Sequence, residues 1–134
     1  MESEQLQNMR RAFEAWNQGN WAGSLGYMRE DVTWRTGNLL PDVDAVYEGH
    51  EGVRRFWQDF TEPWDEILIT LEEVLDEQES QLLVVVRFRA RGRGGVEVDM
   101  PLFQVYRFDD QALLKEFNAF GDEAEARRAA GVTV

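Results

Sequence analysis

The hydrophobic positions of the chain change their spacing at Pro63. Before Pro63, apolar residues recur at steps of three and four, which is the spacing of one helical face. Two helices are predicted from such faces, one on Leu6, Met9, Phe13 and Trp16, the other on Val53, Phe56, Trp57 and Phe60. After Pro63 the spacing becomes two, which predicts strands near residues 66–77, 81–91, 96–109 and 112–120. Helices followed by consecutive strands indicate an α+β fold with an antiparallel sheet.

Shorter signals fill the segments between these elements. Gly19 stands where a left-handed residue ends the first helix, and Asn20 is suited to cap a short second helix. The face of that second helix is predicted from Trp21, Leu25 and Met28. The β-branched, alternating residues 32–36 predict a strand, and residues 37–49 predict a long loop.

The chain closes with a predicted helix. Asp122 and Glu125 have a capping-box-like spacing at its start, and Gly131 stands at its end. The sequence has 134 residues, with no internal repeat and no long linker. We therefore expect a single domain that covers residues 1–134.

The alternation along the two central strands predicts which side chains face inward. On the first strand, one face carries Leu82, Val84, Val86, Phe88 and Ala90. On the next, one face carries Val98, Met100, Leu102, Gln104, Tyr106 and Phe108. A turn around residues 92–95 places Arg89 opposite Asp99 and Arg91 opposite Glu97, and such pairs fix the register of a hairpin. Asp99 is therefore predicted to lie on the outer face.

The charge of the chain excludes several classes of partner. The sequence has 14 basic and 26 acidic residues, a formal net charge of −12. Nucleic acid and anionic membranes would be repelled, so we expect neither as a partner. The alternating arginines Arg87, Arg89, Arg91 and Arg93 are interpreted as a solvated face or a dimer surface.

The residue types restrict the chemistry and the location of the chain. It has no cysteine and one histidine, so we expect no disulfide, no metal site and no cofactor. Asp42, Asp44 and Glu48 are interpreted as a solvated acidic loop rather than a site for a hard cation. The first residues lack a secretion signal, and the longest apolar run, residues 82–86, is too short to span a membrane. We therefore expect a cytoplasmic protein.

Several segments occur in an order that is typical of one family. They are Asn17-Gln18-Gly19-Asn20-Trp21, Glu30-Asp31-Val32-Thr33-Trp34, Tyr47-Glu48-Gly49-His50-Glu51-Gly52-Val53, residues 103–108 and residues 120–126. Over nearly all of its length the chain resembles SnoaL-like members of the nuclear transport factor two-like superfamily. The resemblance implies a cone-shaped α+β barrel, in which N-terminal helices pack on a strongly curved antiparallel sheet around an apolar pocket. It also implies a homodimer through the sheet. The superfamily includes polyketide cyclases, ketosteroid isomerases and non-enzymatic binding domains.

The ketosteroid isomerase pattern fails when it is placed on this chain. Ala12 stands where that pattern has its oxyanion tyrosine, Thr36 where it has its carboxylate base, and Gln104 where it has its protonated acid. A carboxamide cannot shuttle protons, although it can donate a hydrogen bond to a developing oxyanion. Isomerase chemistry of that type is therefore not expected, and the cyclase interpretation is weakened too.

Three residues are the candidates for catalysis. Glu116 alternates with Leu114 and Asn118 and is predicted to face the pocket beside Gln104, where burial would raise its pKa. The alternative is a Glu116 that pairs with an arginine or lies at a wet rim. His50 is a conceivable base, but its place at the start of the third helix favours a capping or surface role.

The tryptophans are the strongest indication of a ligand. Aromatic and polar residues that we expect to line one cavity are Trp16, Trp34, Tyr47, Trp57, Phe60, Trp64, Met100 and Asn118, together with Gln104 and Glu116. Such a wall suits a flat, mostly apolar molecule, although plain core packing explains any one aromatic residue equally well.

Two hypotheses follow. The first is a cofactor-independent cyclase- or isomerase-like enzyme that acts on a hydrophobic, carbonyl-bearing, polyketide-like molecule. In it, Gln104 orients the carbonyl and Glu116 moves the proton. The second is a non-catalytic ligand-binding or dimerisation module of the same fold.

Overall fold

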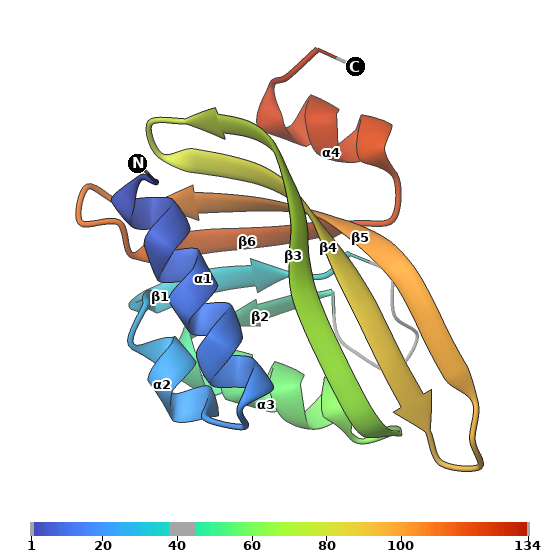
Figure 1. The fold of residues 1–134 in the computed structure, drawn as a ribbon. Helices are drawn as coiled ribbons and strands as arrows, with labels where there is room; N and C mark the ends of the chain where they lie inside the picture. Colours follow the sequence, from blue (N-terminus) through green and yellow to red (C-terminus); the bar gives the residue numbers. More distant parts are fainter. Residues whose placement is uncertain (1, 38–44, 134) are drawn as a thin grey trace.

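The computed structural model describes residues 2–37 and 45–133. The helices are α1 (Glu4–Asn17), α2 (Trp21–Leu25), α3 (Gly49–Thr61) and α4 (Glu123–Ala130). The strands are β1 (Met28–Arg35), β2 (Val46–Glu48), β3 (Trp64–Gln78), β4 (Gln81–Gly92), β5 (Glu97–Phe108) and β6 (Leu114–Phe120). Within the described residues these strands form one sheet in the order β2-β1-β6-β5-β4-β3 (Figure 1). The α+β class predicted from the sequence is confirmed.

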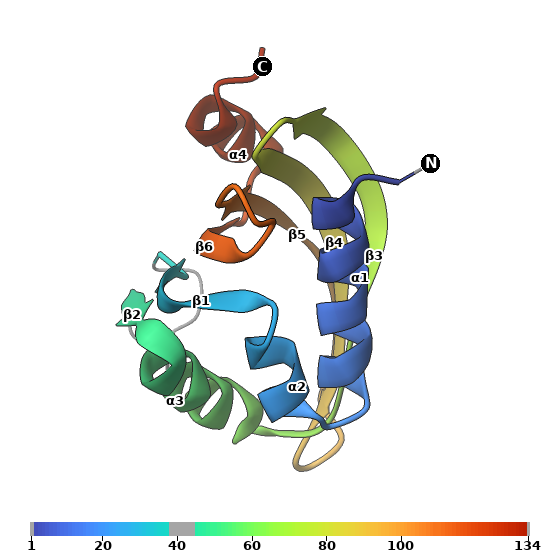
Figure 2. The same ribbon diagram turned by 90° about the vertical axis from the view of Figure 1, so that its left-hand side faces the viewer.

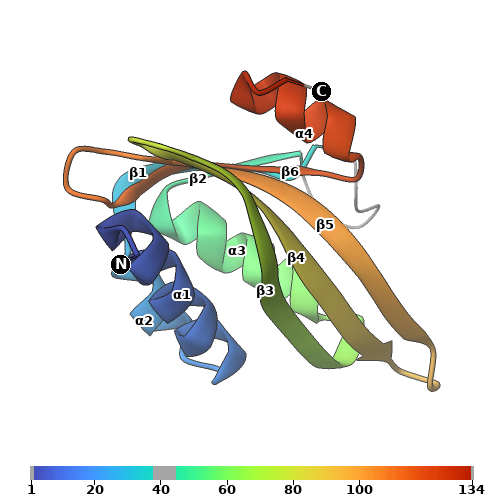
Figure 3. The same ribbon diagram turned by 45° about the horizontal axis from the view of Figure 1, so that its top comes forward.

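The sheet separates two layers of helices. Leu82 and Val84 of β4 pack with residues of α1, α2 and α3 in the main core, whereas Leu83 between them packs with Ala126 of α4. Because neighbouring residues of a strand point to opposite faces, α1–α3 cover one face and α4 the other (Figures 2 and 3). The inward alternation predicted for β4 and β5 is therefore confirmed.

The predicted end of α1 and the predicted start of α2 are both found in the structure. Gly19 has φ +81°, and the N–H of Asn20 donates to the carbonyl of Ala15 at 2.8 Å. The side chain of Asn20 then caps α2 by accepting from the N–H of Gly23 at 3.0 Å. The predicted helical position of Met28 is wrong, because α2 ends at Leu25 and Met28 is the first residue of β1.

The hairpin β4–β5 has the predicted register. Arg89 lies opposite Asp99 and Arg91 opposite Glu97. On the outer face Asp99 accepts from Arg87 Nε at 2.6 Å, and Arg89 Nε lies 3.6 Å away. Arg91 instead pairs with Glu66 of β3 at 2.5 Å. The outward orientation predicted for Asp99 is therefore confirmed.

The prediction of a purely antiparallel sheet is wrong. Strand β1 pairs with β6 in parallel, with Trp34 opposite Phe117, so the sheet is mixed. The alternation of a strand shows which residues share a face but does not reveal its partner, because pairing is decided by the whole topology. The predicted loop 37–49 also contains β2 and the start of α3. Asp42 and Asp44, which were interpreted as part of a solvated acidic loop, lie outside the described residues.

The last helix begins and ends where expected. Asp122 is the residue before α4, although its side chain makes no capping hydrogen bond, and Gly131 ends the helix with φ +73°. Ala126 and Ala130 of α4 pack against Leu83 and Val105. No helix in the described part of the chain is long and apolar enough to cross a membrane.

Candidate functional site

A cavity of about 130 Å³ lies between the helices α1–α3 and the sheet face that they cover. Its wall is almost entirely apolar and aromatic. Among the predicted ligand-contacting residues, the wall contains Trp16, Trp34, Trp57, Phe60, Met100 and Gln104. Met100 is 38% exposed, so the cavity reaches the surface near this residue.

Besides Glu116, three of the predicted lining residues lie elsewhere. Tyr47 is buried in the core, where its hydroxyl donates to Asp59 at 2.8 Å and its ring contacts Phe56 edge-on. Trp64 packs edge-on against Phe88 at 5.7 Å, beyond the cavity wall. Asn118 projects to the opposite face of the sheet. The sequence identified these residues as large or buried but did not distinguish core packing from a cavity wall.

The predicted position of Glu116 in the cavity is wrong. The β5–β6 register shifts by one residue, so that Arg107 lies opposite Glu116 and Phe108 opposite Leu114. Such a bulge breaks the simple alternation on which the prediction rested. Leu114 and Phe117 line the cavity, whereas Glu116 and Asn118 face away from it. Glu116 therefore lies across the sheet from Gln104.

On that outer face Glu116 is held by cationic and amide groups. Arg107 Nη1 and Asn118 Nδ2 each donate to its Oε1 at 2.9 Å, and Arg35 Nε lies 3.9 Å away. Partial burial acts to raise the pKa of Glu116, but the hydrogen bond from Asn118 and the charges of Arg107 and Arg35 outweigh it, so the pKa lies below its ordinary value. This is the alternative named from the sequence, a glutamate paired with arginine.

Gln104 and Tyr106 form the central polar pair of the cavity. Both lie on β5, both line the cavity, and the Tyr106 hydroxyl donates to Gln104 Oε1 in a short hydrogen bond. Burial raises the pKa of Tyr106 strongly, so its hydroxyl stays protonated at neutral pH. With its oxygen occupied by Tyr106, the amide of Gln104 keeps its N–H groups for a ligand.

Other polar side chains of the wall are engaged in holding the fold. Asn17 pairs with the backbone of Ile69 on edge strand β3, donating to its carbonyl at 2.7 Å and accepting from its N–H at 3.2 Å. Asn8 donates to the carbonyl of Ala112 at 3.2 Å, and Ser24 to that of Trp21 at 2.7 Å. The two asparagines join α1 to its neighbours, and the Ser24 bond lies within α2. All three groups have little capacity left for a ligand.

The described part of the cavity wall is uncharged. Among the described residues that line it there is no aspartate, glutamate, histidine, lysine or arginine. A wall of this kind binds by shape, apolar contact and neutral hydrogen bonds. It offers no carboxylate or imidazole to accept a proton from a bound molecule.

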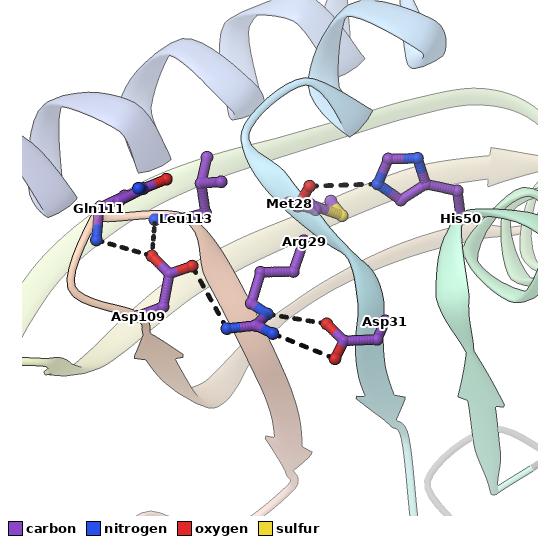
Figure 4. Close-up of polar contacts among 7 residues, drawn as sticks. All are labelled: Met28, Arg29, Asp31, His50, Asp109, Gln111 and Leu113. Atoms are coloured by element: carbon purple, nitrogen blue, oxygen red, sulfur yellow. Dashed lines mark hydrogen bonds and ion pairs between the residues drawn. The ribbon is translucent and has the colours of Figure 1, made fainter.

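His50 is not among the residues that line the cavity, and its polar contact with β1 is drawn in Figure 4. It is the second residue of α3, and its Nε2 lies 3.1 Å from the carbonyl oxygen of Met28 on β1. Near it, Arg29 joins Asp31 at 2.8 Å and Asp109 at 3.5 Å. No group of three or more histidine, cysteine, aspartate or glutamate side chains within residues 2–37 and 45–133 is arranged to hold a metal ion.

Comparison with known families decides the classification. A model of the SnoaL-like domain matches residues 9–116, most of the chain. The chain belongs to the SnoaL-like domain family. A search of curated proteins finds no match to this SnoaL-like domain.

Solved structures share the fold of the SnoaL-like domain at low identity. A nuclear transport factor two-like protein of unknown function from Burkholderia pseudomallei has 22% identity and a TM-score of 0.80, with 95% of this chain and 97% of that one covered. A Mycobacterium tuberculosis protein in complex with estradiol-17β-hemisuccinate has 15% identity and a TM-score of 0.78, covering 92% and 97%. A Δ5-3-ketosteroid isomerase from Mycobacterium sp. has 13% identity and a TM-score of 0.77, covering 92% and 96%.

The structure adds site residues that the sequence did not nominate. Tyr106 and Phe117 both line the cavity, and Ala119 leaves space between Gln104 and β1 because its side chain is small. Tyr106 could have been predicted from the sequence, because it lies two residues after Gln104 on β5 and therefore points to the same face of the sheet. Phe117 and Ala119 could not be predicted, because the bulge before them places them on the opposite face of β6 from the one that simple alternation predicts.

Proposed function

We propose that this SnoaL-like domain binds an uncharged, mostly apolar ring compound that carries a carbonyl group. The observation that supports the proposal best is an aromatic cavity whose described lining holds no charged side chain and keeps amide N–H groups on Gln104. An uncharged wall favours a neutral ligand, because an ion would lose its hydration without a partner.

The roles of the lining residues follow from their contacts. The indoles of Trp16 and Trp57 and the ring of Phe60 supply apolar contact area. Gln104 would donate to the ligand's carbonyl oxygen, and Tyr106 would hold the amide in that orientation through its hydrogen bond to Oε1. A ligand of one or two rings matches a cavity of about 130 Å³, whereas a larger one would need to extend past Met100.

The binding module is favoured over the enzyme. The catalytic hypothesis needed Glu116 in the cavity as the proton carrier, and Glu116 is paired with Arg107 on the other face. The two similar mycobacterial proteins, a steroid complex and a steroid isomerase, support a ring-compound ligand without deciding between binding and turnover. A homodimer through the sheet and a cytoplasmic location stay predictions from the sequence.

Titration with 1-tetralone tests the proposal directly. We expect saturable changes in the amide NMR spectrum, centred on residues of the cavity wall. Ala119→Leu adds three heavy atoms to the cavity wall and should reduce binding at least tenfold, whereas Ala129→Leu adds the same atoms to the exposed face of α4 and should not. Absence of saturable binding to the wild type, or equal binding to Ala119→Leu, would contradict the proposal.

A further inference from the structure

Trp34 lies at one end of an aromatic row that crosses three strands. Its indole stacks on Phe117 of β6, with ring centroids 3.9 Å apart and an interplanar angle of 22°. Phe117 in turn contacts Tyr106 of β5 at 5.2 Å. The row follows the strand pairing, in which Trp34 lies opposite Phe117 and Phe117 opposite Tyr106. Trp34 thus lines the cavity from β1, while Gln104 and Tyr106 line it from β5.

The indole nitrogen of Trp34 has no hydrogen-bond partner. Trp34 is 9% exposed, and throughout residues 2–37 and 45–133 its Nε1 is the one fully buried side-chain nitrogen or oxygen without a bond. An unsatisfied buried donor costs about 1–3 kcal/mol, and native proteins keep few of them. A structural indole in a packed core usually directs its N–H to a carbonyl or to water.

The surroundings of the indole do not favour a resident water molecule. Phe117 and Phe56 cover Trp34, the latter at 5.5 Å. A buried water is held by two to four polar partners, and two aromatic rings supply none. A ligand acceptor is better suited, because the rest of the ligand gains apolar contact with the same rings.

We propose that the N–H of Trp34 donates a hydrogen bond to the bound molecule. The site would then recognise a compact ring compound with two acceptor oxygens at opposite ends, as in a cyclic dione. This inference rests on the proposed function and specifies its ligand. One oxygen accepts from Trp34 Nε1, and the other accepts from the amide of Gln104.

The strand geometry sets the separation of the two oxygens. Strands β1 and β5 are separated by β6, and neighbouring strands lie about 4.8 Å apart, so the two donors are on strands roughly 10 Å apart. Two hydrogen bonds of about 2.9 Å therefore require acceptor oxygens at least roughly 4 Å apart. Oxygens on opposite corners of a six-membered ring are farther apart than this limit, whereas oxygens on adjacent ring carbons are closer together.

The acceptor reaches Nε1 after a local side-chain change. Phe56 contacts the indole at 5.5 Å and stacks on Phe60 at 5.3 Å and 13°, and we propose that its ring moves aside when the ligand enters. Side-chain rotations of this kind are common on binding. The proposal therefore includes a shift of Phe56 on binding of a dione. Binding of a hydrocarbon without acceptor oxygens does not require this shift.

Three ligands separate this inference from the proposed function. They are 1,4-naphthoquinone with two carbonyl groups, 1-tetralone with one and naphthalene with none. We expect Trp34→Phe, which keeps an aromatic ring and removes the N–H, to weaken 1,4-naphthoquinone binding by about threefold to tenfold. Binding of 1-tetralone, whose carbonyl is held by Gln104, and of naphthalene should change less than twofold.

The indole proton of wild-type Trp34 gives a second readout that needs no variant. Its NMR resonance, assigned from through-space contacts to Phe117, should move downfield with 1,4-naphthoquinone and not with naphthalene. An unmoved resonance, or an equal loss of all three ligands in Trp34→Phe, would overturn the inference and leave the proposed function standing. Absence of 1-tetralone binding to the wild type would instead overturn the proposed function.

Discussion

Arg107 of β5 donates to Glu116 of β6 at 2.9 Å, on the sheet face that α4 covers. The same arginine donates to Gln81 at 3.1 Å and to the carbonyl oxygen of Ala129, near the end of α4, at 2.7 Å. This guanidinium therefore joins two neighbouring strands and the last helix. The carboxylate that the sequence suggested for catalysis is part of the attachment of α4.

Glu116 should contribute to stability at neutral pH and lose that contribution in acid. Its pKa is lowered in the folded state, so its contribution is complete above its ordinary pKa and is lost as the pH falls through the folded-state pKa. Glu116→Gln should lower the free energy of unfolding by about 1–2 kcal/mol at neutral pH, as expected for charge-assisted hydrogen bonds. Urea denaturation from neutral pH to about pH 3 measures the difference, which should shrink in acid. Glu125→Gln, on an exposed part of α4, is the control, and a pH-independent difference for Glu116→Gln would contradict the prediction.

Gln104 and Tyr106 should behave as one unit. Gln104→Leu removes the acceptor of the buried Tyr106 hydroxyl and should cost about 1–3 kcal/mol of stability. Adding Tyr106→Phe removes the stranded hydroxyl, so the double variant should be more stable than Gln104→Leu. Chemical denaturation of the four proteins gives the coupling energy, and additive costs would show that the pair is not linked.

Asn17 should control the edge strand beside the cavity. Asn17→Ala deletes both hydrogen bonds to the Ile69 backbone and should destabilise the protein by about 1–2 kcal/mol. Amide exchange at Ile69 should accelerate, since its N–H loses the Asn17 acceptor. Asn17→Asp keeps that acceptor and should protect Ile69 better than Asn17→Ala. Equal exchange rates in both variants would contradict this role.

Gly19 should be required for its backbone conformation rather than for space. A Cβ at Gly19 would meet no atom within 4 Å, yet φ is +81°. Gly19→Ala should therefore cost roughly 1 kcal/mol from the left-handed conformation, and Gly19→Asn should cost less, because asparagine adopts it more readily. Thermal denaturation ranks the variants, and an alanine as stable as glycine would disprove the argument.

The sequence predicted well those features that depend on local chemistry. The caps at Gly19 and Asn20 and the Arg89–Asp99 register were correct, because each is decided by a few neighbouring residues. The parallel pairing of β1 with β6 was missed, because period and composition do not encode the partner of a strand.

The site was predicted in part for the same reason. Gln104 and four predicted aromatic residues, among them Trp16 and Trp57, line the cavity, since alternation and helical spacing fix their faces. Glu116 and Asn118 were assigned to the wrong face, because a one-residue bulge inverts every later position of β6. A bulge leaves no reliable pattern in the sequence. The face on which the residues after it lie is therefore known only from the structure.

The uncharged cavity has a consequence when it is combined with the acidic surface. The chain carries a formal charge of −12, but none of it comes from the described lining of the cavity. Anions approaching from solution meet a repulsive field that weakens with salt, whereas neutral molecules do not. A carboxylic acid would therefore enter far less readily than its methyl ester of nearly the same shape. The protein would thus select neutral ligands over anionic ones before the ligand contacts the cavity wall.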